Sequence, residues 1–363
     1  MDVRADYPLD NLNTLRLPAR AQWYAEPAST EALVALLREP RWRGVPRTVL
    51  GGGSNLVLAG DISGLVIRPM MRGLRELPGG LLEVQAGEEW DSVVARSIEA
   101  GWQGLENLSL IPGSAGAAPV QNIGAYGVEL CHHLAGLEAV SLQDGQIHHF
   151  TAEQCDFGYR ESRFKSAEPG QWLITRLQLR LNRAPVLQLG YADLSERFAA
   201  LPESGRNAAG LRQVICQLRR EKLPDPAALP NAGSFFKNPV VEATHWAALR
   251  ERFPAIVGYP QADGRVKLAA GWLIEQAGWK GRRHGPLGMH ERQALVLVNH
   301  GGASGATVLA FAEAVRESVQ TMFQVQLEQE PVTLGSPGQA LQARRSGSAG
   351  PPGAPGGDII TNA

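Results

Sequence analysis

The sequence predicts an α+β protein in which a β-rich first part is followed by a part that mixes helices and strands. Short segments with strand-like apolar patterns dominate the chain up to residue 181, whereas most helical patterns come after residue 192. Prolines gather at residues 224–230, which makes this stretch a linker candidate between the two parts. A length of 363 residues is enough for two or three domains.

Composition and charge exclude several classes of protein. A content of 44% hydrophobic and 20% charged residues is typical of a soluble globular protein with a sizeable core. The net charge of −1 argues against binding nucleic acid by broad charge neutralisation. The longest apolar runs, such as residues 294–298, are too short to span a membrane, and the N-terminus lacks the pattern of a signal peptide. We expect no nucleic-acid or membrane partner.

The three cysteines, Cys131, Cys155 and Cys216, are widely spaced and include no C-x-x-C pair. An odd and sparse set fits reduced thiols better than a disulfide framework, so we expect a cytoplasmic protein. The adjacent histidines at 132–133 and 148–149 suggest a metal site at first sight. Neighbouring residues of a strand point to opposite faces and cannot both bind one ion, so no metal is expected.

The first part contains two predicted helices and several predicted strands. Ser29 precedes a periodic apolar run that Pro40 ends, which predicts a short helix. Residues 88–100 have acids in the first turn and Gly101 at the end, which predicts a second helix. Strands are predicted at residues 48–50, 56–58, 81–86, 134–142, 147–150 and 172–181, with a hairpin turn at 143–146.

The second part is predicted to be mainly helical up to a polar tail. Helices are expected at residues 193–201, 207–222, 240–252, 267–277 and 305–323. Residues 335–363 are rich in Gly, Pro and Ser and contain too little apolar surface to fold, so a disordered tail is expected there.

The chain is organised around residues 110–127, a stretch with four glycines, two prolines and a series of alanines. Side chains this small cannot build a core, but they allow a ligand to approach the backbone closely and to meet its N–H groups. A tight packing loop is the simpler reading of an isolated run of this kind. Because a second glycine cluster lies upstream, we interpret the stretch as a cofactor cradle.

The upstream cluster is Gly51-Gly52-Gly53-Ser54-Asn55, followed by Leu56. A Rossmann fingerprint needs a third glycine where Leu56 stands and a helix after it, and a Walker A loop needs G-K-[ST] after the glycines. Neither is present. A loop between two strands remains, either a glycine-rich hairpin turn or a seat for a pyrophosphate made of consecutive N–H groups. A ligand held between the two glycine-rich loops is the better hypothesis.

Several motifs occur together in an order that resembles one enzyme family. They are G-G-G-S-N at 51–55, L-I-P-G-S-A-G-A-A-P-V-Q-N-I-G-A-Y-G at 110–127, G-Y-R-E-S at 158–162, K-L-P-D-P at 222–226, N-A-G-S-F-F-K-N-P at 231–239 and A-G-W-L-I-E-Q-A-G-W-K-G at 270–281. Over about residues 10–334 the chain resembles UDP-N-acetylenolpyruvoylglucosamine reductase (UDP-N-acetylmuramate dehydrogenase), in the subgroup with a substrate-covering tyrosine loop.

The resemblance implies a two-lobed FAD-binding domain of the vanillyl-alcohol-oxidase/PCMH type over residues 1–206, with lobes of about 1–70 and 71–206. A C-terminal α+β substrate-binding domain would cover residues 207–334. The implied reaction uses NADPH and non-covalent FAD to reduce an enolpyruvyl UDP-sugar in peptidoglycan synthesis, and hence supports cell wall biogenesis, cell shape, the cell cycle and division. A monomeric enzyme is expected.

The same resemblance implies the roles of individual residues. Arg160 would bind the substrate carboxylate, Ser234 would donate a proton with Lys237 or Asn238 polarising it, and Glu330 would stabilise the intermediate. The chain has L-E-Q-E-P-V where L-E-P-E-V is expected, so the choice of Glu330 over Glu328 is a hypothesis. Tyr159, Tyr191, Lys222, Asn238 and Gln293 would bind substrate. The cofactor-binding residues would be Gly51, Gly52, Gly53, Ser54, Asn55, Leu56, Pro112, Gly113, Ser114, Gly116, Ala117, Gln121, Asn122 and Gly124.

Two alternatives stay open at this point. A flavin oxidase of the same fold, acting on a sugar alcohol or lactone, would use both glycine-rich loops but leave Ser234 and Glu330 without a role. A nucleotide-sugar sensor could keep the scaffold without the chemistry, although Arg160, Ser234 and Glu330 are all present.

Overall fold

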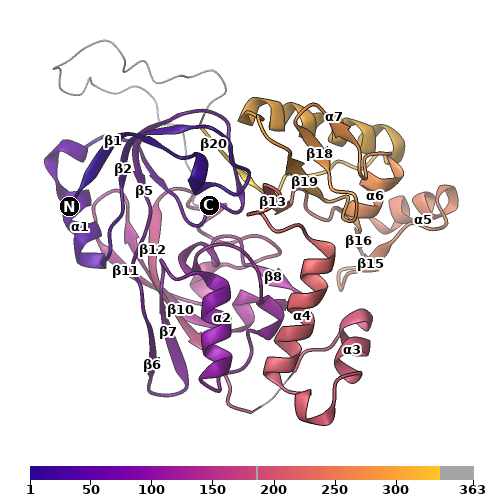
Figure 1. Ribbon diagram of the computed structural model, residues 1–363, viewed down its shortest axis with the longest axis horizontal. Coiled ribbons are helices and arrows are strands. Elements are labelled where there is room, and N and C mark those ends of the chain that lie inside the picture. The colour runs from indigo at the N-terminus through magenta and orange to yellow at the C-terminus, as the bar shows by residue number, and fades with distance from the viewer. Residues whose placement is uncertain (185–186, 336–363) are drawn as a thin grey trace.

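The computed structural model describes residues 1–184 and 187–335, which form three regions, with residues from the third returning to the first (Figure 1). The tail expected at 335–363 lies outside the described residues, apart from Gly335. The first two regions come from the β-rich part of the chain, and the third comes from the part after residue 230. Their contacts place the two glycine-rich loops and the C-terminal segment together.

The first region is a mixed four-stranded sheet in the order β1-β2-β5-β3. Its strands are β1 (Val3–Pro8), β2 (Arg20–Ala25), β5 (Ile62–Ile67) and β3 (Arg47–Val49). Helix α1 (Thr30–Arg38) packs Leu33, Leu36 and Leu37 into its core. Ser29 begins this helix as predicted, because its hydroxyl accepts a hydrogen bond of 3.1 Å from the Ala32 N–H.

The second region is an antiparallel five-stranded sheet in the order β11-β10-β12-β7-β6. Its strands are β11 (Ile147–Thr151), β10 (Leu134–Ser141), β12 (Trp172–Arg180), β7 (Leu81–Gln85) and β6 (Leu74–Leu77). The predicted hairpin between β10 and β11 is confirmed by their antiparallel pairing. Helix α2 (Trp90–Glu99) and the glycine-rich loop with its short strands β8 (Gly124–Ala125) and β9 (Val128–Glu129) belong to this region.

The third region combines two small sheets with helices. The larger sheet has the order β13-β19-β18-β17, and the smaller has the order β14-β16-β15. The strands are β13 (Asn231–Ser234), β14 (Val240–Val241), β15 (Gly258–Pro260), β16 (Val266–Leu268), β17 (Arg283–His284), β18 (Leu287–Met289) and β19 (Val296–Asn299). The helices are α5 (Ala243–Arg252), α6 (Ala270–Gln276) and α7 (Gly305–Phe323).

Two predicted helices begin later than the sequence suggested. Residues 240–241 form β14, which pairs with β16 at 266–268, so α5 and α6 start only after these strands. The physical reason is tertiary: the paired strands bury Leu268, which local periodicity assigned to a helix. Helix α7, in contrast, has the predicted bounds.

Helices α3 (Ala192–Ala199) and α4 (Ala208–Lys222) pack against each other and lie beside the second region. Arg212 of α4 forms a two-pronged ion pair with Asp91 of α2, at 2.6 and 2.9 Å. The chain then leaves α4 and enters the third region through residues 223–230. The domain limits at 206 and 207 stay a prediction, and this ion pair ties α4 to the first part of the chain.

The C-terminal segment, residues 328–334, joins the third region to the first. Strand β20 (Val332–Leu334) pairs in parallel with β4 (Leu56–Leu58), and Figure 1 shows β20 next to the indigo part of the chain. The strands on either side of residues 51–55 therefore pair with different partners, β3 with β5 and β4 with β20. The glycine-rich hairpin that the sequence left open is excluded.

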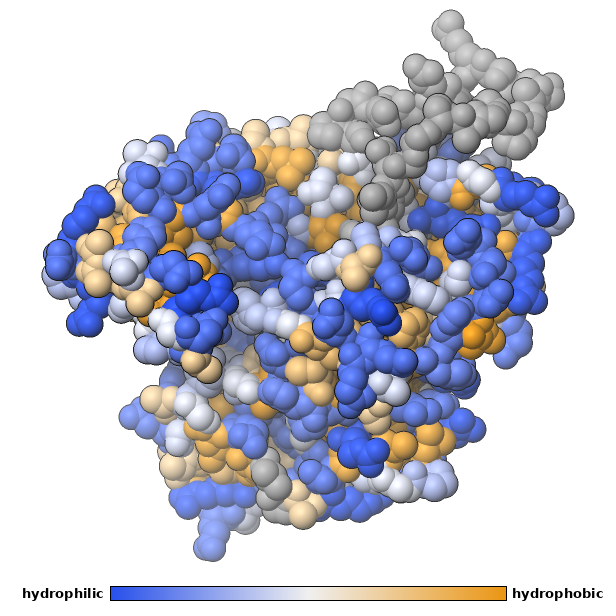
Figure 2. Space-filling view, turned by 180° about the vertical axis from the view of Figure 1, so that it is seen from behind, coloured by the Kyte–Doolittle hydropathy of each residue, from blue (hydrophilic) through white to orange (hydrophobic). Residues whose placement is uncertain are grey.

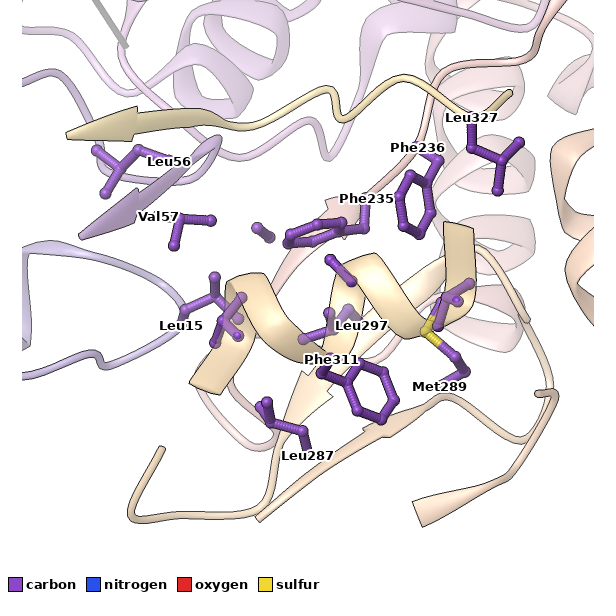
Figure 3. Packing of buried hydrophobic residues seen from close by; sticks show 14 of the residues in the cluster. Leu15, Leu56, Val57, Phe235, Phe236, Leu287, Met289, Leu297, Phe311 and Leu327 are labelled. Carbon is purple, nitrogen blue, oxygen red and sulfur yellow. The ribbon is translucent and has the colours of Figure 1, made fainter. Parts of the chain in front are cut away.

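One hydrophobic core extends across the first and third regions. In Figure 3, Leu15, Leu56 and Val57 lie near Phe235, while Phe236, Leu297 and Phe311 continue the same cluster. Phe235 and Phe236 are both 0% exposed. Burying a side chain of this size is worth about 1.5–3 kcal/mol, so the core resists separation of the two regions.

The surface is mostly polar on the face shown in Figure 2, where hydrophobic residues form small separated groups. Among residues 1–184 and 187–335, no helix combines the length and the apolar character needed to cross a membrane.

The two glycine-rich loops touch, and this contact yields a prediction. A Cβ on Gly52 would lie 2.6 Å from Gly113 Cα, closer than real atoms pack. We expect Gly52→Ala to push the loops apart and to lower the free energy of unfolding by about 1–3 kcal/mol. Urea denaturation followed by circular dichroism measures this value.

The matched control is Gly190→Ala, because a Cβ at Gly190 has no atom within 4 Å and its φ is ordinary. The control should change stability by less than about 0.5 kcal/mol. Equal effects of the two substitutions would contradict the close contact.

Candidate active site

The two glycine-rich loops form the walls of a cleft of about 480 Å³. An adjoining cavity of about 260 Å³ includes Gly51 and Gly116 and shares Ser114, Ala117 and Val120 with the cleft. The cleft is lined by Gly52, Ser54, Asn55, Trp90, Ile111, Pro112, Gly113, Ser114, Ala117, Ala118, Val120, Gln121, Ile123, Lys165 and Val332. Most of the predicted cofactor-binding residues therefore lie around one space.

The first loop offers backbone donors. In the described part of the chain, none of the five N–H groups of residues 51–55 donates a hydrogen bond to a protein atom. The loop is held instead through its carbonyls and side chains: Gly53 O accepts from the Thr14 N–H at 2.9 Å, and the Ser54 hydroxyl donates to Pro112 O at 2.9 Å. Consecutive N–H groups without an acceptor fit an anionic group such as a pyrophosphate.

The second loop uses many of its N–H groups within the protein, contrary to the expectation of bare donors. Ala115 donates to Glu88 O and Gly116 to Ala86 O, at 2.8 and 2.9 Å. The loop instead approaches the neighbouring backbone closely, because a Cβ on Gly116 would lie only 2.6 Å from the Ala86 Cβ. The loop therefore packs tightly behind the cleft and presents an apolar wall.

These observations fit a flavin dinucleotide. The N–H groups of residues 51–55 suit the pyrophosphate, and Trp90, Ile111 and Ile123 provide an apolar wall for a ring system. The Ser114 hydroxyl lies buried at both cavities and has no hydrogen-bond partner among the described residues. Such an atom is expected to bond a ligand, since leaving it unpaired is costly.

Asn55, Gln121 and Asn122 contact protein groups in the structure. Asn55 donates its side-chain amide to Gln121 across the two loops. Asn122 is 0% exposed, and its amide bonds Glu129 at 2.9 Å and the Gly158 carbonyl at 3.1 Å. A cofactor contact of Asn122 stays a prediction, and the observed role of its side chain is to shape the loop.

Arg160 lies beside the cleft in a constrained turn. Its backbone has φ +57°, a left-handed conformation that non-glycine residues rarely adopt. The guanidinium donates to the Gly124 carbonyl at 2.7 Å and to the Asn122 carbonyl at 3.4 Å. Its own carbonyl accepts from the Lys165 ammonium at 2.9 Å. The second glycine-rich loop thus orients the Arg160 guanidinium, and Lys165 holds the Arg160 backbone.

Glu330 is the carboxylate that meets Arg160. The Arg160 Nε lies 3.2 Å from Glu330 Oε1, and only 12% of the Glu330 side chain is exposed. Burial raises the pKa of Glu330 above its ordinary value, while the charges of Arg160, Lys165 and Lys237 act against this rise. Glu328 is 70% exposed and pairs with Lys237 instead. The structure therefore brings Glu330, and not Glu328, to Arg160.

Ser234 ends β13, next to the C-terminal segment. The Glu330 N–H donates to the Phe235 carbonyl at 3.0 Å, and the Lys237 N–H donates to the Glu328 carbonyl at 2.9 Å. These backbone bonds place the residues after Ser234 alongside Glu328 and Glu330. The sequence motifs N-A-G-S-F-F-K-N-P and L-E-Q-E-P-V thus meet in space.

The expected activators of Ser234 have other partners. The Lys237 ammonium lies between Glu161 and Glu328, at 2.8 and 2.6 Å. The Asn238 side chain accepts a hydrogen bond of 2.9 Å from the Ala270 N–H at the start of α6. Both side chains therefore stabilise the surroundings of the site.

The predicted substrate residues lie at several places around the site. Tyr159 makes a cation–π contact with Lys267, whose ammonium lies 4.7 Å from the ring centroid. Tyr191 is 53% exposed and packs edge-on against Tyr126 of the second loop, at 5.7 Å between centroids. Lys222 binds Asp193 of α3 at 2.8 Å. Gln293 precedes β19, and its side chain accepts from the Leu295 N–H at 3.4 Å.

Sequence reasoning missed Lys165. Lys165 lines the cleft, its ammonium donates a hydrogen bond to the Arg160 carbonyl, and burial lowers its pKa. Lys165 follows Arg160 by five residues in a segment without helical or strand periodicity, so spacing alone gave no signal for it. Among the described residues, no group of three or more His, Cys, Asp or Glu side chains is suited to hold a metal ion.

Comparisons with known proteins agree with this geometry. A family model described as "FAD binding domain" matches residues 21–151, and one described as "UDP-N-acetylenolpyruvoylglucosamine reductase, C-terminal domain" matches residues 225–334. The UDP-N-acetylenolpyruvoylglucosamine reductase of Pseudomonas aeruginosa is 51% identical over 338 residues, covering 91% of this chain and 98% of that protein. The reductase of Burkholderia mallei is 52% identical over 336 residues, covering 91% and 96%.

A solved structure extends the likeness to the fold. The crystal structure of UDP-N-acetylenolpyruvylglucosamine reductase from Thermus caldophilus has a TM-score of 0.63 and 25% identity, and the match covers 92% of this chain and 98% of that one. The predicted α+β fold class, with an FAD-binding part followed by a C-terminal domain of the reductase type, is confirmed. FAD is the cofactor, and NADPH is the hydride donor. The chain thus belongs to the UDP-N-acetylenolpyruvoylglucosamine reductase family of FAD-containing oxidoreductases.

Proposed function

We propose that Arg160, Ser234 and Glu330 form the reacting centre for the family's reaction. That reaction is the NADPH-dependent reduction of UDP-N-acetylenolpyruvoylglucosamine to UDP-N-acetylmuramate, a step of peptidoglycan precursor synthesis. The observation that carries the proposal is the ion pair of Arg160 with the buried Glu330, next to a cleft that fits FAD. Held in this cleft, FAD would supply the hydride transfer from NADPH to the enolpyruvyl methylene carbon.

Adding hydride to this carbon moves the C=C electron pair toward the carboxylate, which builds negative charge on an enolate. Arg160 supplies a fixed positive charge there, because the Gly124 and Asn122 carbonyls hold its guanidinium. A guanidinium can bind a carboxylate through two parallel N–H bonds. Arg160 therefore binds the substrate carboxylate and stabilises the charge that develops on it.

One proton must then reach the α-carbon of the substrate. Ser234 donates this proton from its hydroxyl, and water returns a proton to the serine oxygen afterwards. Glu330, protonated to higher pH than an ordinary carboxyl, donates a hydrogen bond to the enolate oxygen. The antiparallel contact of residues 235–237 with residues 328–330 keeps both groups on one side of the site.

The remaining residues bind the two ends of the substrate. The predicted FAD contacts are supported by the cleft that residues 51–56 and 112–124 surround. Tyr191 would cover the bound UDP-sugar from the α3 side, and Lys222, Asn238, Gln293 and Tyr159 would contact it. A mobile tyrosine cover is supported by the exposure of Tyr191 and by its contact with Tyr126.

We further propose that the chain acts in the cytoplasm as a monomer. Three free cysteines among the described residues support a reducing compartment. Through peptidoglycan the reaction would contribute to cell wall biogenesis, cell shape, the cell cycle and cell division.

An anaerobic absorbance titration of the purified protein tests the proposed function. The bound flavin should bleach with NADPH and recover its absorbance when UDP-N-acetylenolpyruvoylglucosamine is added. Recovery with oxygen alone, together with peroxide formation, would support the oxidase alternative. A protein that binds UDP but cannot be loaded with FAD would support the sensor alternative.

Ser234→Ala tests the proton donor. Reduction of the flavin by NADPH should stay near the wild-type rate, while reoxidation by the enolpyruvyl substrate should slow by about 10²–10⁴-fold. Stopped-flow absorbance measures the two half-reactions separately. If both slow equally, Ser234 only shapes the pocket, and a normal reoxidation rate would remove it from the chemistry.

The raised pKa of Glu330 predicts a pH dependence. A carboxyl with a raised pKa keeps its proton above the ordinary range near 4.5 and loses it as pH increases through the shifted value. The substrate-reduction step should therefore slow with rising pH. Glu330→Gln should be about 10²–10⁴-fold slower and should lose this pH dependence.

Glu328→Gln is the control for this experiment, since Glu328 is exposed and stands two residues before Glu330. It should keep the wild-type pH profile. A rate that rises with pH, or a Glu330→Gln profile that still matches the wild type, would contradict the assigned role.

A further inference from the structure

Lys165 brings a positive charge to a cleft whose walls are otherwise neutral. Among the described residues that line the cleft, it is the only charged one, and 13% of its side chain is exposed. The other lining residues are apolar, glycine or uncharged polar residues. Holding a cation away from water costs free energy unless anions or hydrogen-bond acceptors compensate for the lost hydration.

The protein compensates for this charge only in part. Of the three N–H donors of the Lys165 ammonium, one has an acceptor in the described part of the chain, the Arg160 carbonyl at 2.9 Å. The nearest carboxylate oxygen is Glu161 Oε1, at 4.0 Å. The same oxygen accepts a hydrogen bond from the Lys237 ammonium at 2.8 Å. Glu161 therefore neutralises Lys237 first, and two donors and much of the charge of Lys165 remain for a ligand.

The contacts of Lys165 place it at the reacting end of the cleft. The carbonyl that it holds belongs to Arg160, whose guanidinium pairs with Glu330 at 3.2 Å. Val332, two residues after Glu330, lines the same cleft. The N–H groups of residues 51–55 already suit the pyrophosphate of FAD. The charge of Lys165 is therefore available to the flavin ring.

Two other cations lie near this end, and both already have anionic partners. The Arg160 guanidinium pairs with Glu330, and two carboxylates flank the Lys237 ammonium at 2.8 and 2.6 Å. Neither of these two residues is among those that line the cleft. Lys165 is thus the cation whose field is least compensated where a flavin ring would lie.

We propose that Lys165 sets the reduction potential of the bound FAD by stabilising its reduced form. Uptake of hydride adds two electrons and one proton to a flavin, and hence one negative charge. A fixed cation in a site that excludes water stabilises such a charge, and charge near the flavin ring is one means by which proteins tune it. Only the location of the reacting end, at Arg160 and Glu330, rests on the proposed function.

The experiment measures the reduction potential of the FAD-loaded enzyme, anaerobically and by absorbance, against a reference dye of known potential. Lys165→Gln removes the charge but keeps an N–H donor for the Arg160 carbonyl. It should lower the equilibrium constant for flavin reduction by about tenfold or more, which is a potential about 30 mV lower for a two-electron couple. No enolpyruvyl substrate is needed for this measurement.

Three further variants separate the charge from the hydrogen bond. Lys165→Met removes both and should lower the potential as far as Lys165→Gln does, and it carries the same test if the glutamine variant does not fold. Lys165→Arg keeps the charge and should stay within about threefold of the wild-type equilibrium constant. The matched control is Arg163→Gln, a neighbouring cation that pairs with Glu168 at 3.5 Å and is not among the residues lining the cleft. It should leave the potential unchanged.

Other outcomes would overturn the proposal. A wild-type potential in both Lys165→Gln and Lys165→Met would show that the charge does not act on the flavin. A lower potential in Lys165→Met alone would make Lys165 a residue that only positions Arg160. Weaker binding of oxidised FAD with an unchanged potential would assign the ammonium to the pyrophosphate. The proposed function fails separately, if NADPH reduces the wild-type flavin but the enolpyruvyl substrate does not reoxidise it.

Discussion

The site depends on the backbone hydrogen bonds of the C-terminal segment, residues 328–334. Within seven residues this segment pairs first with residues 235–237, then with the loop at Asn55 and finally with β4. The Val332 N–H donates to the Asn55 carbonyl at 3.0 Å, and the Ala59 N–H donates to the Leu334 carbonyl at 2.7 Å. One short segment therefore connects the first glycine-rich loop, the residues after Ser234, and Glu330, and it fixes the distances between them.

The shared hydrophobic core gives this connection its rigidity. Phe235 and Phe236 are buried among residues of the first and third regions, directly beside the backbone bonds that carry Glu330. Separating the first and third regions would expose this core to water, and the free-energy cost of exposing apolar surface keeps the two regions together. Outside this core, Tyr191 at the start of α3 is exposed and packs edge-on against Tyr126.

The charges of the site are arranged in two different ways. Arg160, Glu330 and Lys165 are partly buried beside the cleft, so their electric fields act on whatever binds there. Lys237 is also buried, but Glu161 and Glu328 neutralise it and keep it in place. The charges of Arg160, Glu330 and Lys165 are therefore suited to act on a bound substrate, whereas the ion pairs of Lys237 stabilise the surrounding structure.

The sequence by itself determined much of the local structure and the family, and it predicted which residues form the site. Apolar periodicity predicted β10, β11, β12, α1 and α7 closely, because it depends only on which residues of an element face a core, and this pattern is visible in the sequence. The ordered motifs predicted the family, and with it FAD, NADPH and the choice of Arg160, Ser234 and Glu330. Because the sequence lacks G-K-[ST] and a third glycine after residues 51–55, it also indicated that this loop is neither a Walker A loop nor a Rossmann fingerprint.

Only the tertiary structure decided how these pieces meet. No local pattern shows that β4 pairs with β20 across 276 positions of the chain, that residues 240–241 and 266–268 form strands, or that Glu330 rather than Glu328 faces Arg160. Lys165 stood out only through its position at the cleft and its hydrogen bond to the Arg160 carbonyl. Long-range pairing and desolvation depend on contacts between residues far apart in the sequence, and a single sequence does not display them.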